Sequence, residues 1–158
     1  HPEGEFGPDA KGFGLRTATA TPMGRAFYRA PLCALRLADT DLIALMGWQR
    51  PVLAHEHDLR AFATAFRALP LGPGKMLDVT PAHDRVQATL YDGDHLAVIN
   101  ETPETRQLSV RMPPDTPAHR VWRQVVTGQQ TTVVDTEGGL ELRLTTEPYS
   151  LQTLIAVP

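Results

Sequence analysis

Residues 86–90 are Val-Gln-Ala-Thr-Leu, and residues 140–144 are Leu-Glu-Leu-Arg-Leu. Apolar and polar side chains alternate in both stretches, which is typical of a strand with one face on a core and one in water. About eight short segments of this kind follow residue 75, separated by turn residues at a spacing of roughly 8–12 residues. The expected strands are 76–80, 85–91, 95–100, 107–112, 120–126, 131–135, 140–145 and 151–157. This pattern predicts an antiparallel β-sandwich over residues 75–158.

Three short polar segments between these strands have the composition of hairpin turns. They are Asp92-Gly93-Asp94, Asn100-Glu101-Thr102-Pro103 and Glu137-Gly138-Gly139. Asp, Asn and Gly are favoured in tight turns because they tolerate positive φ, so we expect a hairpin at each place. Asn100-Glu101-Thr102 also matches the N-glycosylation acceptor pattern. We interpret it as a turn, since Pro103 follows it directly.

Residues 1–70 have a different texture, rich in Ala, Leu and Arg at helical spacing. Thr21-Pro22 is a typical helix start and predicts a helix over about 22–38, with a kink or break at Pro31. A second apolar face predicts a helix over 56–69. Between the helices, residues 42–46 are apolar without interruption, which favours a strand over 41–46 that is buried on both faces. Helix, strand and helix are pieces of an α/β layer, so the chain is α+β by content, with residues 71–74 as a linker.

Length and charge exclude several functional classes. The chain has 158 residues, too few for a complete eight-stranded α/β barrel. Its formal charge of −3 leaves no basic excess for nucleic acid, and no apolar run is long enough to cross a bilayer. We therefore expect neither nucleic acid nor membrane as a partner. The chain starts at His1 without an initiator methionine, so we expect it to begin mid-protein or to be processed.

Two segments are candidate ligand sites. The opening His1-Pro2-Glu3-Gly4-Glu5 places an imidazole and two carboxylates in a Gly/Pro-rich loop, although composition alone favours a solvated terminus. Trp48 and Gln49 directly follow the predicted strand 41–46, where the loops of α/β sheets carry ligands. There the Trp48 indole would stack on a sugar ring while Gln49 binds a hydroxyl group. Packing of Trp48 over the end of the sheet remains an equal alternative.

Other candidate chemistry is set aside. His55-Glu56-His57 lacks the spacing of a zinc motif and is interpreted as the polar first turn of the second helix. Cys33 is expected to be a buried, inert thiol. The two serines, Ser109 and Ser150, fall in predicted strands and not in a nucleophile elbow. No phosphate-binding glycine loop is present, and we predict no metal and no cofactor.

The order of these parts resembles the C-terminal end of a (β/α)8-barrel glycoside hydrolase. The features that carry the resemblance are a Glu-bearing loop, a helix, a buried strand ending in Gly47-Trp48, and a helix ending in Leu69-Pro70. Residues 95–102 and 147–154 are similar to strands of the sandwich that follows many such barrels. The resemblance implies a partial α/β barrel segment, helix–strand–helix, followed by an all-β antiparallel sandwich.

The resemblance also implies roles for individual residues. Glu3 would be the catalytic nucleophile and Trp48 the sugar platform, with His1, Glu5 and Gln49 as further substrate-binding residues. The acid/base carboxyl group would come from an earlier strand that this sequence does not contain. We therefore expect a chain that binds carbohydrate substrate together with the remainder of the barrel, and that is inactive alone.

Two other interpretations stay open at this stage. One is a non-enzymatic sandwich that binds carbohydrate or protein, and the other is a protein that completes its sheet by forming oligomers. The β half has few aromatic residues (Tyr91, Trp122 and Tyr149), which favours a structural role for the sandwich. Two Lys against thirteen Arg, with abundant Ala and Pro, suggest a bacterial source. The sequence predicts no cellular location.

Overall fold

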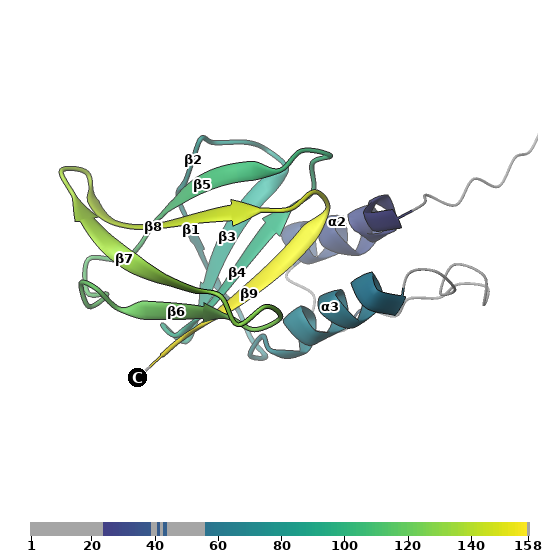
Figure 1. Cartoon of the computed structure of the whole chain (residues 1–158), viewed down its shortest axis with the longest axis horizontal. Helices are drawn as coiled ribbons and strands as arrows, with labels where there is room; N and C mark the ends of the chain where they lie inside the picture. Colours follow the sequence, from purple (N-terminus) through teal and green to yellow (C-terminus); the bar gives the residue numbers. More distant parts are fainter. Residues whose placement is uncertain (1–23, 39–40, 42, 44–55, 158) are drawn as a thin grey trace, which may run out of the picture.

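The computed structural model describes residues 24–38, 41, 43 and 56–157 (Figure 1). Within this part the chain is an α+β protein in which nine strands form a folded antiparallel sheet. Two α-helices cover one face of that sheet. The predicted α+β class and the predicted antiparallel β-sandwich are confirmed.

The strands match the expected positions to within a few residues. They are β1 (Lys75–Leu77), β2 (Val79–Thr80), β3 (Val86–Tyr91), β4 (His95–Asn100), β5 (Arg106–Arg111), β6 (Val121–Gln124), β7 (Gln130–Thr136), β8 (Gly139–Thr146) and β9 (Ser150–Ala156). Their order across the sheet is β1-β3-β4-β9-β6-β7-β8-β5-β2, and every neighbouring pair is antiparallel.

The sheet folds into two leaves. One contains β1, β3, β4, β9 and β6, and the other contains β7, β8, β5 and β2. The fold arises because two segments change partners along their length. The first residues of β7 pair with β6, and the later ones pair with β8. On the other side, β1 pairs with β3, whereas β2 pairs with β5. The single strand predicted over 76–80 is therefore wrong: Asp78 separates two short strands that belong to different leaves. A bend at this point lets one segment close the side of the sandwich.

The main core lies between the two leaves. Its fully buried side chains include Val98 from one leaf, Val110 and Leu142 from the other, and Trp122 from β6. These residues occupy alternate positions of their strands, as the period-2 pattern predicts. Burial of so many large apolar side chains supplies most of the driving force for this part of the fold.

A second core lies between β4, β9 and the helical layer. That layer comprises a 3₁₀-helix, η2 (Gly24–Tyr28), and two α-helices, α2 (Arg29–Ala38) and α3 (Glu56–Arg67). Its buried residues are Tyr28, Leu32, Leu35, Phe62 and Ala65, which pack against Ala97, Ile99 and Leu151. The hydroxyl of Thr153 on β9 donates a hydrogen bond of 2.7 Å to the Ala65 carbonyl of α3. Strand β4 is thus buried on both faces.

The helix predicted over 22–38 is divided, but not where expected. The change from 3₁₀- to α-helix falls at Tyr28, and Pro31 lies in the first turn of α2. A proline costs little there because the first N–H groups of a helix have no intrahelical partner. The predicted kink at Pro31 is therefore corrected. Helix α3 begins at Glu56 with Glu56 and Asp58 in its first turn, as expected.

The two α-helices run in the same direction (Figure 1). Near their starts, Arg25 Nε lies 3.6 Å from Asp58 Oδ1. Near their ends, Leu35 and Phe66 line the same hollow. The chain between Ala38 and Glu56 therefore leaves at one end of the helical layer and returns at the other. Of the strand predicted at 41–46, only Asp41 and Ile43 are described, neither of them in a strand, and the rest lies outside the described residues.

Two of the three predicted hairpins are confirmed. Asp92 and Gly93 have φ values of 50° and 79°, the signature of a type I′ turn between β3 and β4. Residues 137–138 join β7 to β8, with Thr136 paired to Gly139. The hairpin predicted at Asn100 is wrong, because β4 and β5 are not neighbours and lie in different leaves. The turn residues there connect the leaves.

Candidate functional site

The site residues predicted from sequence are His1, Glu3, Glu5, Trp48 and Gln49. All five lie outside the described residues. Their roles therefore stay predictions. The described part shows the junction between the helical layer and the sandwich and the hollows beside it.

A buried carboxylate joins the helical layer to the sheet. The side chain of Glu101, just after β4, is 5% exposed. Its Oε2 accepts a hydrogen bond of 3.1 Å from Arg36 Nε, and its Oε1 lies 3.6 Å from Arg29 Nε. Arg36 is 17% exposed and Arg29 55%, so the Arg36 pair is the more shielded from water and the stronger of the two. The carboxylate is held by two cations, which suits anchoring rather than proton transfer.

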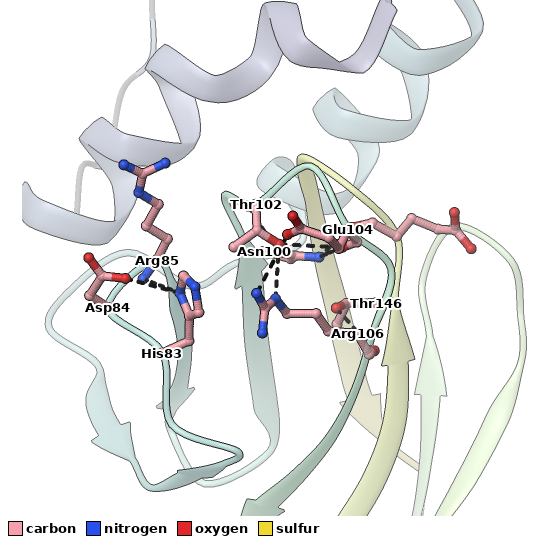
Figure 2. A network of polar contacts seen from close by, with 9 residues as sticks. His83, Asp84, Arg85, Asn100, Thr102, Glu104, Arg106 and Thr146 are labelled. Carbon is pink, nitrogen blue, oxygen red and sulfur yellow. Dashed lines mark hydrogen bonds and ion pairs between the residues drawn. The ribbon is translucent and has the colours of Figure 1, made fainter.

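Asn100, at the end of β4, is the centre of a second polar network (Figure 2). Its Nδ2 donates to the carbonyls of Glu104 and Glu147 at 2.8 and 2.9 Å. Its Oδ1 accepts from the backbone N–H and the hydroxyl of Thr102 at 3.0 and 2.6 Å. The side chain is fully buried. With both N–H groups occupied, Asn100 serves the connection between strands and cannot accept a glycan in this fold.

The connection extends to Arg106 on β5. Its Nε donates a hydrogen bond of 3.0 Å to the Thr102 hydroxyl, and Figure 2 shows its guanidinium turned toward that residue. Glu147, whose carbonyl binds Asn100, also carries a side chain whose Oε2 lies 3.3 Å from Arg25 Nη1. The two crossings between leaves, β4 to β5 and β8 to β9, are therefore tied to each other and to η2.

A small cavity of about 110 Å³ lies between η2, α3 and the β8–β9 turn. Tyr28, Asp58, Gln124 and Gln152 are among the residues that line it. The Tyr28 hydroxyl is buried and has no hydrogen-bond partner among the described residues. Burial, and to a lesser extent the charge of Asp58, raises the pKa of Tyr28 to about 12. The phenol is therefore neutral at every physiological pH.

A larger, polar groove of about 460 Å³ lies where β6, β8 and β9 approach one another. Most of the residues that line it carry amide or hydroxyl groups, and its apolar residues are Leu108, Leu144 and Leu154. Arg143 is the one charged residue among the described residues that line it, and its Nη2 lies 3.6 Å from Glu141 Oε2. A hydrogen bond from Ser109 lowers the pKa of Glu141; desolvation opposes this lowering, and the charge of Arg143 adds to it.

A third hollow, of about 660 Å³, lies at the ends of the two helices. It is lined mostly by apolar side chains, including Leu59, Phe66, Leu71 and Tyr91. Leu71 is 83% exposed. Asp41 and Ile43, which flank the undescribed residues 44–55, also line it. The hollow has no cluster of acids and bases among its described residues.

The remaining candidate chemistry is as follows. Cys33 is half-buried, so the expectation of a fully buried thiol is corrected. Ser109 and Ser150 donate to Glu141 Oε2 and to the Glu147 carbonyl, and neither pairs with a histidine. Among the described residues no three His, Cys, Asp or Glu side chains gather as metal ligands. In the same part of the chain, no helix combines the length and apolarity needed to cross a bilayer.

Local sequence patterns did not predict a role for Glu101 or Arg36, nor did they predict the polar groove. Glu101 was visible only as part of a turn, and its partner Arg36 is 65 residues away in sequence. The groove had one local signal. Gln124 and Gln152 fall at strand positions that the alternating pattern assigns to the core, and a polar residue at such a position marks an opening or a site.

Comparison with known proteins gives little. No family model matches the chain, and no curated protein matches it. Among solved structures it is similar to an Anoxybacillus α-amylase, described as a new glycosyl hydrolase subclass, with a TM-score of 0.39 and 13% identity. The match covers 74% of this chain and 24% of that one, so this chain spans about a quarter of that protein's length. From so distant a likeness we draw neither an activity nor a substrate.

Proposed function

We propose that this chain is the C-terminal portion of a glycoside hydrolase. Residues 1–70 contribute the last strand–helix units of an α/β barrel and part of the sugar-binding wall. Residues 75–158 form a structural β-sandwich that braces them. The proposed partners are the carbohydrate substrate and the remainder of the barrel.

One observation supports this proposal more than any other. Helices α2 and α3 are parallel, and the segment between them leaves one end of the layer and returns at the other. Successive helices of a (β/α)8 barrel are parallel because a strand runs back between them. The apolar run at 42–46 lies in that segment.

The attachment of the helices to the sandwich suits a bracing role. The Arg36–Glu101 pair, the Thr153–Ala65 hydrogen bond and the shared apolar core fix the helical layer on β4 and β9. Three kinds of contact hold the helical layer in a fixed position on the sandwich. Such rigidity is what a catalytic carboxylate needs from its support.

In the proposed enzyme, Glu3 attacks the anomeric carbon and forms a covalent glycosyl-enzyme intermediate. A second carboxyl group, about 5–5.5 Å away on an upstream strand, protonates the leaving oxygen and then activates water. Trp48 stacks on the sugar ring, and His1, Glu5 and Gln49 bind its hydroxyl groups. Because the second carboxyl group is not part of this chain, the chain alone does not turn over.

The test is an assay of the isolated 158-residue chain on a panel of aryl glycosides. We expect no turnover above that of the Glu3→Gln variant, because only one of the two carboxyl groups is present. Clear turnover by the wild-type chain that Glu3→Gln abolishes would overturn the proposal that the chain is an incomplete enzyme.

A further inference from the structure

We infer that the polar groove of about 460 Å³ between β6, β8 and β9 is a binding site for a neutral, polyhydroxylated ligand such as a polysaccharide chain. The inference rests on the chemistry of the groove and does not involve Glu3. It assigns to the sandwich a function of its own beside its bracing role.

The first argument is the position of the polar side chains. On β9, Leu154 and Ala156 belong to the core between the leaves, and Gln152 occupies the same face two positions earlier. Gln124 is paired directly with Leu154, and Thr131 is paired with the buried Trp122. Three core-facing positions at this end of the sandwich therefore carry amide or hydroxyl groups. Purely structural strands would place apolar residues there.

The second argument is the hydrogen-bonding capacity of the groove. Gln107 and Gln130 are among the residues that line it, both are exposed, and their side-chain amides make no hydrogen bond to any described residue. Gln152 Nε2 donates to the Thr145 carbonyl at 3.0 Å, which holds the amide in place and leaves its oxygen as an acceptor. Amides offer a donor and an acceptor side by side, which suits neighbouring sugar hydroxyls. Leu144, which is half-buried, supplies apolar surface for the C–H face of a ring.

The third argument excludes other classes of ligand. An anion would need unpaired cations, but Arg143 forms an ion pair with Glu141. A nucleic acid would need aromatic platforms or excess positive charge, and the described lining provides neither. The volume lies within the roughly 300–1,000 Å³ typical of small-molecule sites.

The experiment is native gel electrophoresis of the chain in gels that contain a soluble polysaccharide. The probes are dextran, a soluble β-glucan and starch, with the anionic polygalacturonate as a control. We expect retardation in at least one neutral gel and none in polygalacturonate. The double variant Gln124→Ala/Gln152→Ala should bind about tenfold more weakly, because two hydrogen-bonding groups are lost.

A matched control is Gln87→Ala on β3. Gln87 Nε2 donates a hydrogen bond of 3.0 Å to the Thr89 hydroxyl, so this glutamine is held by a hydrogen bond as Gln152 is. Gln87 does not line the groove, so Gln87→Ala should leave retardation unchanged. If the double variant does not fold, Thr131→Val replaces a groove hydroxyl by a methyl group at constant shape and should weaken binding on its own. Glu3→Gln should bind as the wild type does, which separates this inference from the proposed catalytic role.

Three results would overturn the inference. They are no retardation in any neutral gel, equal retardation in polygalacturonate, or unchanged retardation of the folded groove variants.

Discussion

Arg36 on α2 donates a hydrogen bond of 3.1 Å to Glu101, a carboxylate that lies just after β4 and is almost completely buried. This pair joins the helical layer to the sandwich, two parts of the chain that differ in composition and are 65 residues apart at these positions. It makes the position of the helical layer depend on a connection within the sandwich.

We predict that Glu101→Gln destabilises the protein by about 2 kcal/mol, because it leaves the Arg36 guanidinium shielded from water without a countercharge. The free energy of unfolding from urea titration measures the effect. Glu104→Gln is the control. The Glu104 side chain is 60% exposed and lies 3.5 Å from Arg106, so its loss should cost less than about 0.5 kcal/mol. Equal losses for the two variants would contradict the anchoring role of Glu101.

Asn100→Ala should be more damaging. It leaves the carbonyls of Glu104 and Glu147 and two donors of Thr102 without their partner in a buried place. Unpaired buried polar groups cost about 1–3 kcal/mol each, and partial rearrangement should leave a net loss of about 3 kcal/mol. Chemical denaturation measures it. A loss below about 1 kcal/mol, the size of an ordinary surface change, would show that the network does not hold the leaves together.

The buried phenol of Tyr28 makes stability depend on alkaline pH. Its pKa in the folded protein, about 12, lies above the ordinary value of 10.0. The stabilisation from keeping it neutral is therefore complete below pH 10 and is lost as the pH rises toward 12, with a total on the order of 2 kcal/mol. The melting temperature of Tyr28→Phe should equal or slightly exceed that of the wild type at pH 7. Above pH 10 it should fall less steeply with pH than the melting temperature of the wild type. Parallel curves for wild type and variant would contradict this.

Gly74, just before β1, is a position where only glycine fits. A Cβ atom there would clash with the Thr89 methyl group and would lie 2.7 Å from Tyr91 Cε1. Gly74→Ala should therefore cost about 2 kcal/mol through overpacking. Gly138→Ala is the control, since its nearest contact is 3.7 Å and the residue does not require a positive φ. A tolerated Gly74→Ala would show that β1 can move away from β3 at little cost.

Local patterns predicted most of the elements of this fold. Alternation located the strands after residue 75, and Asp92-Gly93 predicted a tight hairpin because few other residue pairs adopt positive φ in succession. Burial on both faces also had a local signal. Residues 96–99 are apolar without interruption, the same pattern as at 42–46, and β4 is indeed covered on both sides.

Long-range pairing could not be predicted in this way. Nothing near Asn100 shows that β4 lies beside β9, some 50 residues later, or that the chain crosses to the other leaf at this point. The Asp78 bend was equally hidden, since residues 76–80 look like one strand until their two partners are known. Glu101 and its arginines meet only because the helices cover β4. Residue types reveal a candidate site when its groups are close in sequence, and these groups are not.

In the proposed function, Glu3 is the nucleophile of a glycosidase that contains this chain. The most direct measurement is the hydrolysis of aryl glycosides by the full-length enzyme that carries this chain, compared among wild type, Glu3→Gln and Glu5→Gln. We predict that Glu3→Gln lowers kcat at least about a thousandfold, whereas Glu5→Gln mainly raises KM. A Glu3→Gln enzyme with unchanged kcat would contradict the claim.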